Sequence, residues 1–178
     1  MPVAFFEWRI FLNLRRRLNI LLGRHIVKCD LFLLRETISP HFRFLSIFDK
    51  NFRYQDGQVY SGYMGLNVER IKLVSVVVEL RKKGVDAFNV PVRYRDQPKL
   101  TKEERFKIAK QHAGSRGDGV AFGGFRTFNA TPMLWSFPLL PSDESKVGGV
   151  VYVDTLDGHF WDLIEYDEYM HDYNAILC

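Results

Sequence analysis

Residues 117–155, GDGVAFGGFRTFNATPMLWSFPLLPSDESKVGGVVYVDT, decide which fold this chain can adopt. The stretch begins with a glycine-rich loop and a short helix, and Pro132 then marks a turn. Two apolar segments follow, WSFPLL at 135–140 and GGVVYVDT at 148–155, separated by a short polar run. Apolar runs with these boundaries predict two strands joined by a turn. The stretch therefore indicates a strand pair rather than a catalytic motif.

The composition is typical of one globular domain. Hydrophobic residues make up 47% of the 178-residue chain, which is enough apolar surface to build a core. The two cysteines, Cys29 and Cys178, are too few for a disulfide scaffold. The sequence shows neither a secretion signal nor an apolar run of membrane-spanning length. We expect a cytoplasmic protein, and a peripheral position at a membrane is the alternative.

The charges are divided unevenly along the chain. Residues 1–112 hold 22 Lys and Arg against 11 Asp and Glu, whereas residues 113–178 hold 3 against 10. Such a division can steer an anionic partner to one face, or it can let the two halves of one fold neutralise each other.

Residues 3–22, VAFFEWRIFLNLRRRLNILL, predict a long amphipathic helix that ends at Gly23. The polar side of this helix is basic, and its apolar side is wider than packing on one domain surface requires. The helix can cap the core of its own domain, form a dimer, or lie at a membrane surface with Arg15–Arg17 as anchors. We expect residues 1–25 to form this helix and residues 26–178 to form a single domain.

The first half of the domain predicts strands followed by a helix. Residues 29–36 and 41–49 are short and rich in aromatic and aliphatic side chains, so we expect them to form an antiparallel pair. Residues 67–84 predict a helix with Asn67 as its N-cap and Gly84 as its end. The expected inner face of this helix holds Val68, Ile71, Val74 and Val78.

The later segments predict one strand-like stretch and two more helices. Residues 90–96 should be extended, with Pro91 at a sheet edge. Thr101 is a good N-cap for a helix that ends at Gly114, because Glu103 and Glu104 follow it in the first turn. Residues 160–177 predict a closing helix, or two short ones.

Two parts of the sequence resemble the GAF domain family. Residues 114–156 have the Gly-containing turn, the "fPL" strand and the "GvvyvD" strand of that family, and residues 26–49 resemble its first strands. The resemblance implies an α+β fold with a central antiparallel sheet flanked by helices. It also implies a sensory domain that binds a small ligand. The two helices predicted between the matching parts depart from the family pattern.

The candidate ligand contacts combine arginine with aromatic side chains. Rings can stack on a planar ligand while guanidinium groups bind its phosphate or carboxylate. The alternative is that alternate residues lie in the core and the arginines face solvent. The candidate residues are Arg93, Tyr94 and Arg95, together with Phe122, Arg126 and Trp135.

Other polar groups point to structural roles rather than to chemistry. We expect Asp154 and Asp157 to cap a strand end, Cys29 to be a small core residue, and Glu168, His171 and Asp172 to lie on a solvent-facing helix surface. The sequence holds no recognised catalytic motif. We therefore predict a protein without catalytic residues, metal or cofactor.

Two functional hypotheses remain. The first is a non-catalytic, GAF-like regulatory domain that binds a small anionic or planar ligand or a protein partner and acts as a homodimer through residues 3–22. The second is a module that binds nucleic acid or another anionic partner through its basic half. Its contacts would be the clusters Arg15–Arg17, Arg81–Lys83 and Arg93–Arg95.

Overall fold

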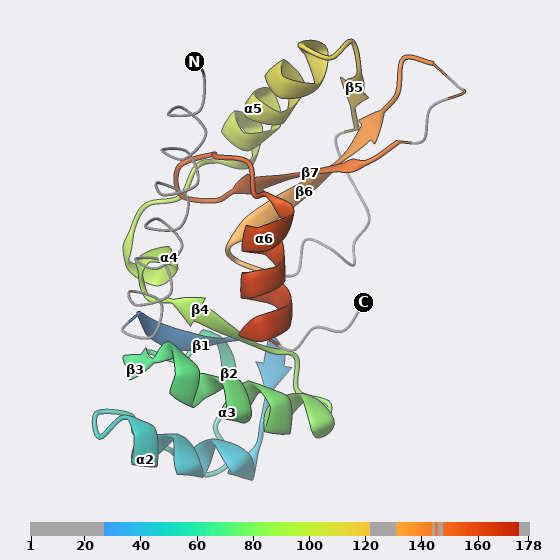
Figure 1. Cartoon of the computed structure of the whole chain (residues 1–178). Helices are drawn as coiled ribbons and strands as arrows, with labels where there is room; N and C mark the ends of the chain where they lie inside the picture. Colours follow the sequence, from blue (N-terminus) through green and yellow to red (C-terminus); the bar gives the residue numbers. More distant parts are fainter. Residues whose placement is uncertain (1–26, 122–130, 144, 146–147, 175–178) are drawn as a thin grey trace, which may run out of the picture.

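The computed structural model describes residues 27–121, 131–143, 145 and 148–174. The predicted helix over residues 3–22 and the candidates Phe122, Arg126 and Cys178 lie outside them. The fold is α+β, as predicted, with antiparallel strands and flanking helices. The prediction of one central sheet is wrong, because the described strands form two separate sheets that lie one above the other in Figure 1.

The first sheet is built around β1 (Lys28–Thr37). Its inward side chains, such as Leu31 and Leu33, are fully buried. All partners of β1 are antiparallel: β2 (Tyr60–Tyr63) and β3 (Val68–Glu69) on one side and β4 (Ala87–Pro91) on the other. Cys29 is fully buried in this sheet, which confirms its predicted place in the core.

The predicted strand over residues 41–49 is wrong. These residues form η1, a 3₁₀ turn (Pro40–Phe44), and then α2 (Leu45–Phe48). The side chain of Ser39 accepts a hydrogen bond from N of His41, and Pro40 occupies the first helical position. A serine cap followed by proline favours a helical start, and this local signal outweighs the apolar pattern.

The helix expected over residues 67–84 is confirmed as α3 (Arg70–Lys82), but its start and its inner face differ. Asn67 is not its N-cap, because Val68 and Glu69 pair with β1 before the helix begins. Ile71 is half exposed. The buried stripe has the i, i+3, i+4, i+7 spacing of a helix face, and it consists of Leu73, Val76, Val77 and Leu80.

The chain then forms α4 (Arg93–Asp96) and α5 (Lys102–Gly114). Residues 93–96 were expected to be extended, and their helical turn corrects that prediction. The start of α5 is confirmed: Thr101 Oγ1 accepts from N of Glu104, while the Glu104 carboxylate accepts from N of Thr101. This reciprocal capping box satisfies two amides that a helix start leaves without partners.

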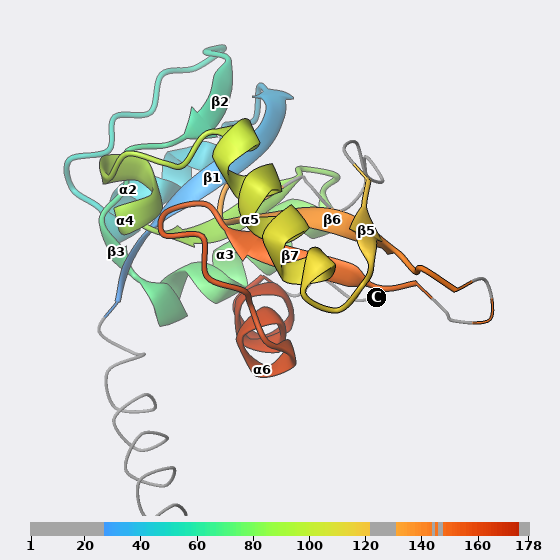
Figure 2. The same cartoon turned by 90° about the horizontal axis from the view of Figure 1, so that it is seen from above.

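The second sheet contains β5 (Gly119–Val120), β6 (Leu134–Leu140) and β7 (Val150–Asp154) in that order. The predicted strand pair is confirmed, with Trp135 opposite Val153 and Phe137 opposite Val151. Helix α5 covers one face of this sheet (Figure 2), where Ala109 packs with Phe137 and Val153.

The closing helix is confirmed as α6 (Leu163–Tyr166) followed by η2 (Asp167–Asp172), a π-helical turn. It runs from the second sheet to the first (Figure 1). A core cluster joins the two sheets there, and it includes Phe88 and Val90 of β4, Leu134 of β6, Trp161 and Met170. None of the helices in the described ranges is both long and apolar enough to cross a bilayer.

Candidate ligand pocket

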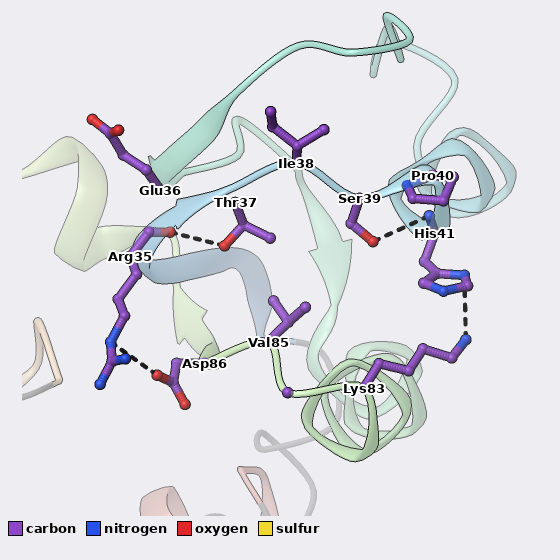
Figure 3. A pocket seen from close by; sticks show the side chains of 11 residues that line it. Arg35, Glu36, Thr37, Ile38, Ser39, Pro40, His41, Lys83, Val85 and Asp86 are labelled. Atoms are coloured by element: carbon purple, nitrogen blue, oxygen red, sulfur yellow. Dashed lines mark hydrogen bonds and ion pairs between the residues drawn. The ribbon is translucent and has the colours of Figure 1, made fainter.

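A cavity of about 470 Å³ lies where β1 ends. One wall is formed by the end of β1 and the start of η1, residues 35–41. The other wall is the turn between α3 and β4, residues 83–86. The pocket is open to solvent, and Figure 3 shows side chains from both walls around it. Two chain segments that are distant in sequence therefore meet at one concave, polar site.

Local sequence signals position both walls. The Ser39–Pro40 cap turns the chain into η1 and places His41 at the rim. On the other wall, Gly84 has a φ of +77°, a left-handed conformation that ends α3 and suits glycine. N of Val85 then donates to the carbonyl oxygen of Leu80 at 3.0 Å, which fixes the turn below Lys83.

The pocket charges are not evenly compensated. Nε of Arg35 lies 3.3 Å from the Asp86 carboxylate, and the Glu36 side chain points away from the cavity in Figure 3. Nζ of Lys83 instead contacts Nδ1 of His41 at 3.3 Å. An ammonium group only donates, so Nδ1 must be the acceptor and the ring proton sits on Nε2. Within the described ranges, no carboxylate forms an ion pair with Lys83, although the charge of Glu79, four residues earlier on α3, acts on it. The rim therefore offers an ammonium group that no direct ion pair occupies.

The structure places neither Arg93 nor Tyr94 in the pocket: Tyr94 lies inside the fold, and Arg93 is exposed at its surface. Tyr94 is fully buried, and its hydroxyl donates a short hydrogen bond to Asp154. Burial and the neighbouring Asp154 raise the pKa of the Tyr94 phenol. Nη2 of Arg93 donates to the hydroxyls of Tyr94 and Tyr169 at 3.2 and 3.3 Å. Arg93 thus connects α4 to the closing helix, and Tyr94 connects α4 to the end of β7.

Arg95 and Trp135 are also engaged by the protein, in two other places. Nη1 of Arg95 lies 2.9 Å from the fully buried carboxylate of Asp30. The ring of Trp135 lies under the guanidinium of Arg105, 4.5 Å from its centroid, on the α5 side of the second sheet. The described candidates are not brought together in one cavity, and ligand binding by them stays a prediction. Lys83 was predicted only as part of the basic cluster Arg81–Lys83, and His41 was not predicted at all, because only the long-range pairing of β1 with β4 brings the two together.

Glu168 corrects the prediction of a solvent-facing helix surface. Its carboxylate is buried and lies 2.9 Å from Nη1 of Arg70, which is also buried. The rings of Tyr169 and Tyr173 flank the Arg70 guanidinium, with their centroids 4.3 and 4.1 Å from its carbon. The ion pair joins the basic half of the chain to the acidic half. This ion pair favours the interpretation that the two halves of the chain partly neutralise each other within the fold.

Asp154 and Asp157 cap a turn, as predicted. Oδ1 of Asp154 accepts from N of Leu156 at 2.7 Å, and Oδ1 of Asp157 accepts from N of His159 at 3.1 Å. With His159 they form a cluster whose ligand atoms lie within 4.8 Å of one another. Both Asp154 oxygens already accept hydrogen bonds from the protein. A metal ion would have to displace these donors.

His159 bridges two carboxylates. Nδ1 lies 2.6 Å from Asp157, and Nε2 lies 2.9 Å from Glu165. Partial burial of the ring opposes its charged form, but the hydrogen bonds to both carboxylates outweigh this effect and raise the pKa of His159. The raised pKa means that the folded protein holds the ring proton more tightly than the unfolded chain does.

We therefore expect His159 to stabilise the fold more in acid than in base. Its contribution should be complete below the ordinary histidine value of about 6.5 and should be lost as the pH rises through the higher folded-state pKa. Urea unfolding from pH 5 to 9 measures this as the stability difference between the wild type and His159→Gln. That difference should shrink as the pH rises across this window. A difference that grows with pH would contradict the assignment.

Comparisons with protein-family models, with curated proteins and with solved structures found no match for this chain. The resemblance to GAF domains thus stays a prediction, as does a dimer formed through residues 3–22. The functional interpretation depends on the geometry of the pocket itself.

Proposed function

We propose that the protein is a non-catalytic regulatory domain that binds a small anionic ligand in the pocket between the end of β1 and the α3–β4 turn. One observation carries the proposal: Lys83 and His41 contact each other at the rim, and no described carboxylate forms an ion pair with the lysine. A phosphate or carboxylate group placed there would accept from Nζ of Lys83 and from Nε2 of His41. Hydrogen bonds to charged groups are stronger than those between neutral groups.

The size and shape of the cavity suit a small molecule. A volume of about 470 Å³ falls within the range of ordinary ligand sites. The apolar part of the lining comes from Ile38, Pro40 and Val85, which can contact the uncharged body of a ligand. Binding would link β1 to the end of α3 and so favour one arrangement of these elements. Such a shift between conformations is how a GAF-like sensory domain would pass on a signal.

Titration with inorganic phosphate, followed by NMR of the His41 ring and the Gly84 amide, tests the proposal. We expect saturable shifts at both positions in the wild type. Lys83→Ala should weaken binding by about 10- to 150-fold, because a hydrogen bond to a charged group is worth about 1.5–3 kcal/mol.

Lys82→Ala is the matched control, because Lys82 is the neighbouring cation and pairs with Glu79 at 2.9 Å outside the pocket. It should leave phosphate binding unchanged. An equal loss of affinity in both variants would mean that phosphate responds only to the overall positive charge of this region and not to a site at Lys83. A wild type without saturable shifts would refute an anion site here. Binding of single-stranded DNA that falls steeply with salt would favour the nucleic-acid hypothesis instead.

A further inference from the structure

The closing helix presents an apolar face that the described residues leave uncovered. Leu163 and Ile164 are 74% and 60% exposed, and Phe160 beside them is 37% exposed. Three acids lie along the same helix: Asp162 directly precedes Leu163, Asp167 follows Ile164 by three positions, and Asp172 ends η2. Asp167 contacts Nδ1 of His171 at 3.1 Å, and within the described ranges no lysine or arginine forms an ion pair with any of the three acids. We call these six residues the α6 face.

A partner for the α6 face must combine an apolar stripe with positive charge. Residues 3–22 of this chain have that composition: the predicted helix is apolar over more than half of its surface, and it carries Arg9 and Arg15–Arg17 against the single acid Glu7. The arginines of this segment are opposite in charge to the aspartates of the α6 face. Its leucines can pack on the apolar side chains of that face. The charge and the hydrophobicity of the two surfaces are therefore complementary.

The start of the described chain is connected to the closing helix through Arg70. The carbonyl oxygen of Val27 accepts from N of Arg70 at 2.9 Å, and the Arg70 guanidinium contacts Glu168 of η2 at 2.9 Å. Glu168 follows Ile164 by four residues, or about 6 Å of helix, whereas a helix over residues 3–22 would be about 30 Å long. The segment that precedes Val27 is thus long enough to cover the α6 face from the end nearest its attachment.

We propose that residues 3–22 pack as a helix on the α6 face of their own chain, with their leucines on Leu163 and Ile164 and their arginines beside the three aspartates. The interaction is independent of the ligand pocket. It would cover the exposed apolar side chains and hold the closing helix between the two sheets. The connection from Val27 through Arg70 to Glu168 favours the same chain over a second copy.

Limited trypsin digestion of the full-length protein tests the contact, because trypsin cleaves after Arg15, Arg16 and Arg17. Leu163→Glu puts a charge in the apolar centre of the face without adding a trypsin site. We expect it to accelerate cleavage at these arginines by about tenfold, since cleavage follows the population in which the segment is undocked. Asp172→Asn should give a smaller acceleration, and added salt should accelerate cleavage in the wild type.

Ile47→Glu is the matched control, because Ile47 on α2 is 79% exposed and lies outside the α6 face. Its cleavage rate should equal that of the wild type. Equal rates in Leu163→Glu and the wild type would overturn the proposal. Protection that appears only as the protein concentration is raised over about two decades would also overturn it, because the segment would then come from a second copy.

Discussion

Replacing Glu168 with glutamine is expected to lower the free energy of unfolding by about 3–5 kcal/mol, the usual cost of removing one partner from a buried ion pair. The side chains of Arg70 and Glu168 are 2% and 9% exposed, and their charged atoms lie 2.9 Å apart. Nε and Nη2 of Arg70 find no hydrogen-bond acceptor among the described residues. Glutamine keeps an acceptor oxygen for Nη1 but has no negative charge, so the buried guanidinium loses its counter-charge and keeps this weaker hydrogen bond and the faces of Tyr169 and Tyr173.

Urea unfolding followed by circular dichroism measures this loss. Glu79→Gln is the matched control, because Glu79 pairs with Lys82 at the same distance of 2.9 Å, but both side chains are more than half exposed. An exposed pair of this kind is worth less than about 1 kcal/mol. The double variant Arg70→Met, Glu168→Leu should recover much of the stability, since it removes both charges together. Similar losses in Glu168→Gln and Glu79→Gln would show that Glu168 is open to water in solution.

The elements that could be predicted from sequence are those whose signals are local. The strands β6 and β7 follow from short apolar runs with glycine or proline at their ends, and their connection is short enough to impose antiparallel pairing. Helix α5 follows from Thr101 and Glu104, which cap each other across three residues. In both cases the residues that determine the structure are neighbours in the chain.

The arrangement of the first sheet could not be predicted in this way. The central strand β1 pairs with three segments that lie up to about sixty residues away, and no local pattern selects among them. The apolar run at 41–49 looks as suitable for pairing as the true partners. Ser39 and Pro40 decide the outcome, because they cap and start a helical turn before a strand can form.

The buried charged residues could not be predicted from sequence either. Arg70 and Glu168 are separated by 98 positions, and each would face solvent without the other. Asp30 is likewise fully buried, and its carboxylate accepts from the amides of Gly65 and Leu66 and from Arg95. Burial is the largest influence on the pKa of Asp30 and raises it, although these hydrogen bonds act in the opposite direction. Hydropathy alone places such charged residues on the surface, because it is assigned to each residue separately and takes no account of an opposite charge elsewhere in the chain.

Asp154→Asn is expected to destabilise the fold by about 3–5 kcal/mol, because a buried donor that loses its acceptor costs about 1–3 kcal/mol. Asp154 is 1% exposed, and Oδ2 accepts from the Tyr94 hydroxyl and from Nε1 of Trp161. Oδ1 accepts from the amides of Leu156 and Asp157. Asparagine keeps one acceptor oxygen for the turn, but its NH₂ group cannot accept from either ring. Two buried donors from different elements would then be left without partners.

Urea unfolding, with Trp161 fluorescence and near-ultraviolet circular dichroism as probes, measures the loss and where it acts. Asp143→Asn is the control, because Asp143 is exposed and its carboxylate accepts only from the nearby Ser145, through its amide and its side chain, among the described residues. It should change stability by less than about 0.5 kcal/mol. Tyr94→Phe removes the hydroxyl, so this position no longer has a buried donor that needs an acceptor. Asp154→Asn should therefore cost less stability in the Tyr94→Phe background than in the wild type. If the stability losses of the two single variants simply add up in the double variant, the Tyr94 hydroxyl does not depend on Asp154. The hydrogen bond that joins α4 to the end of β7 would then not contribute to the stability of the fold.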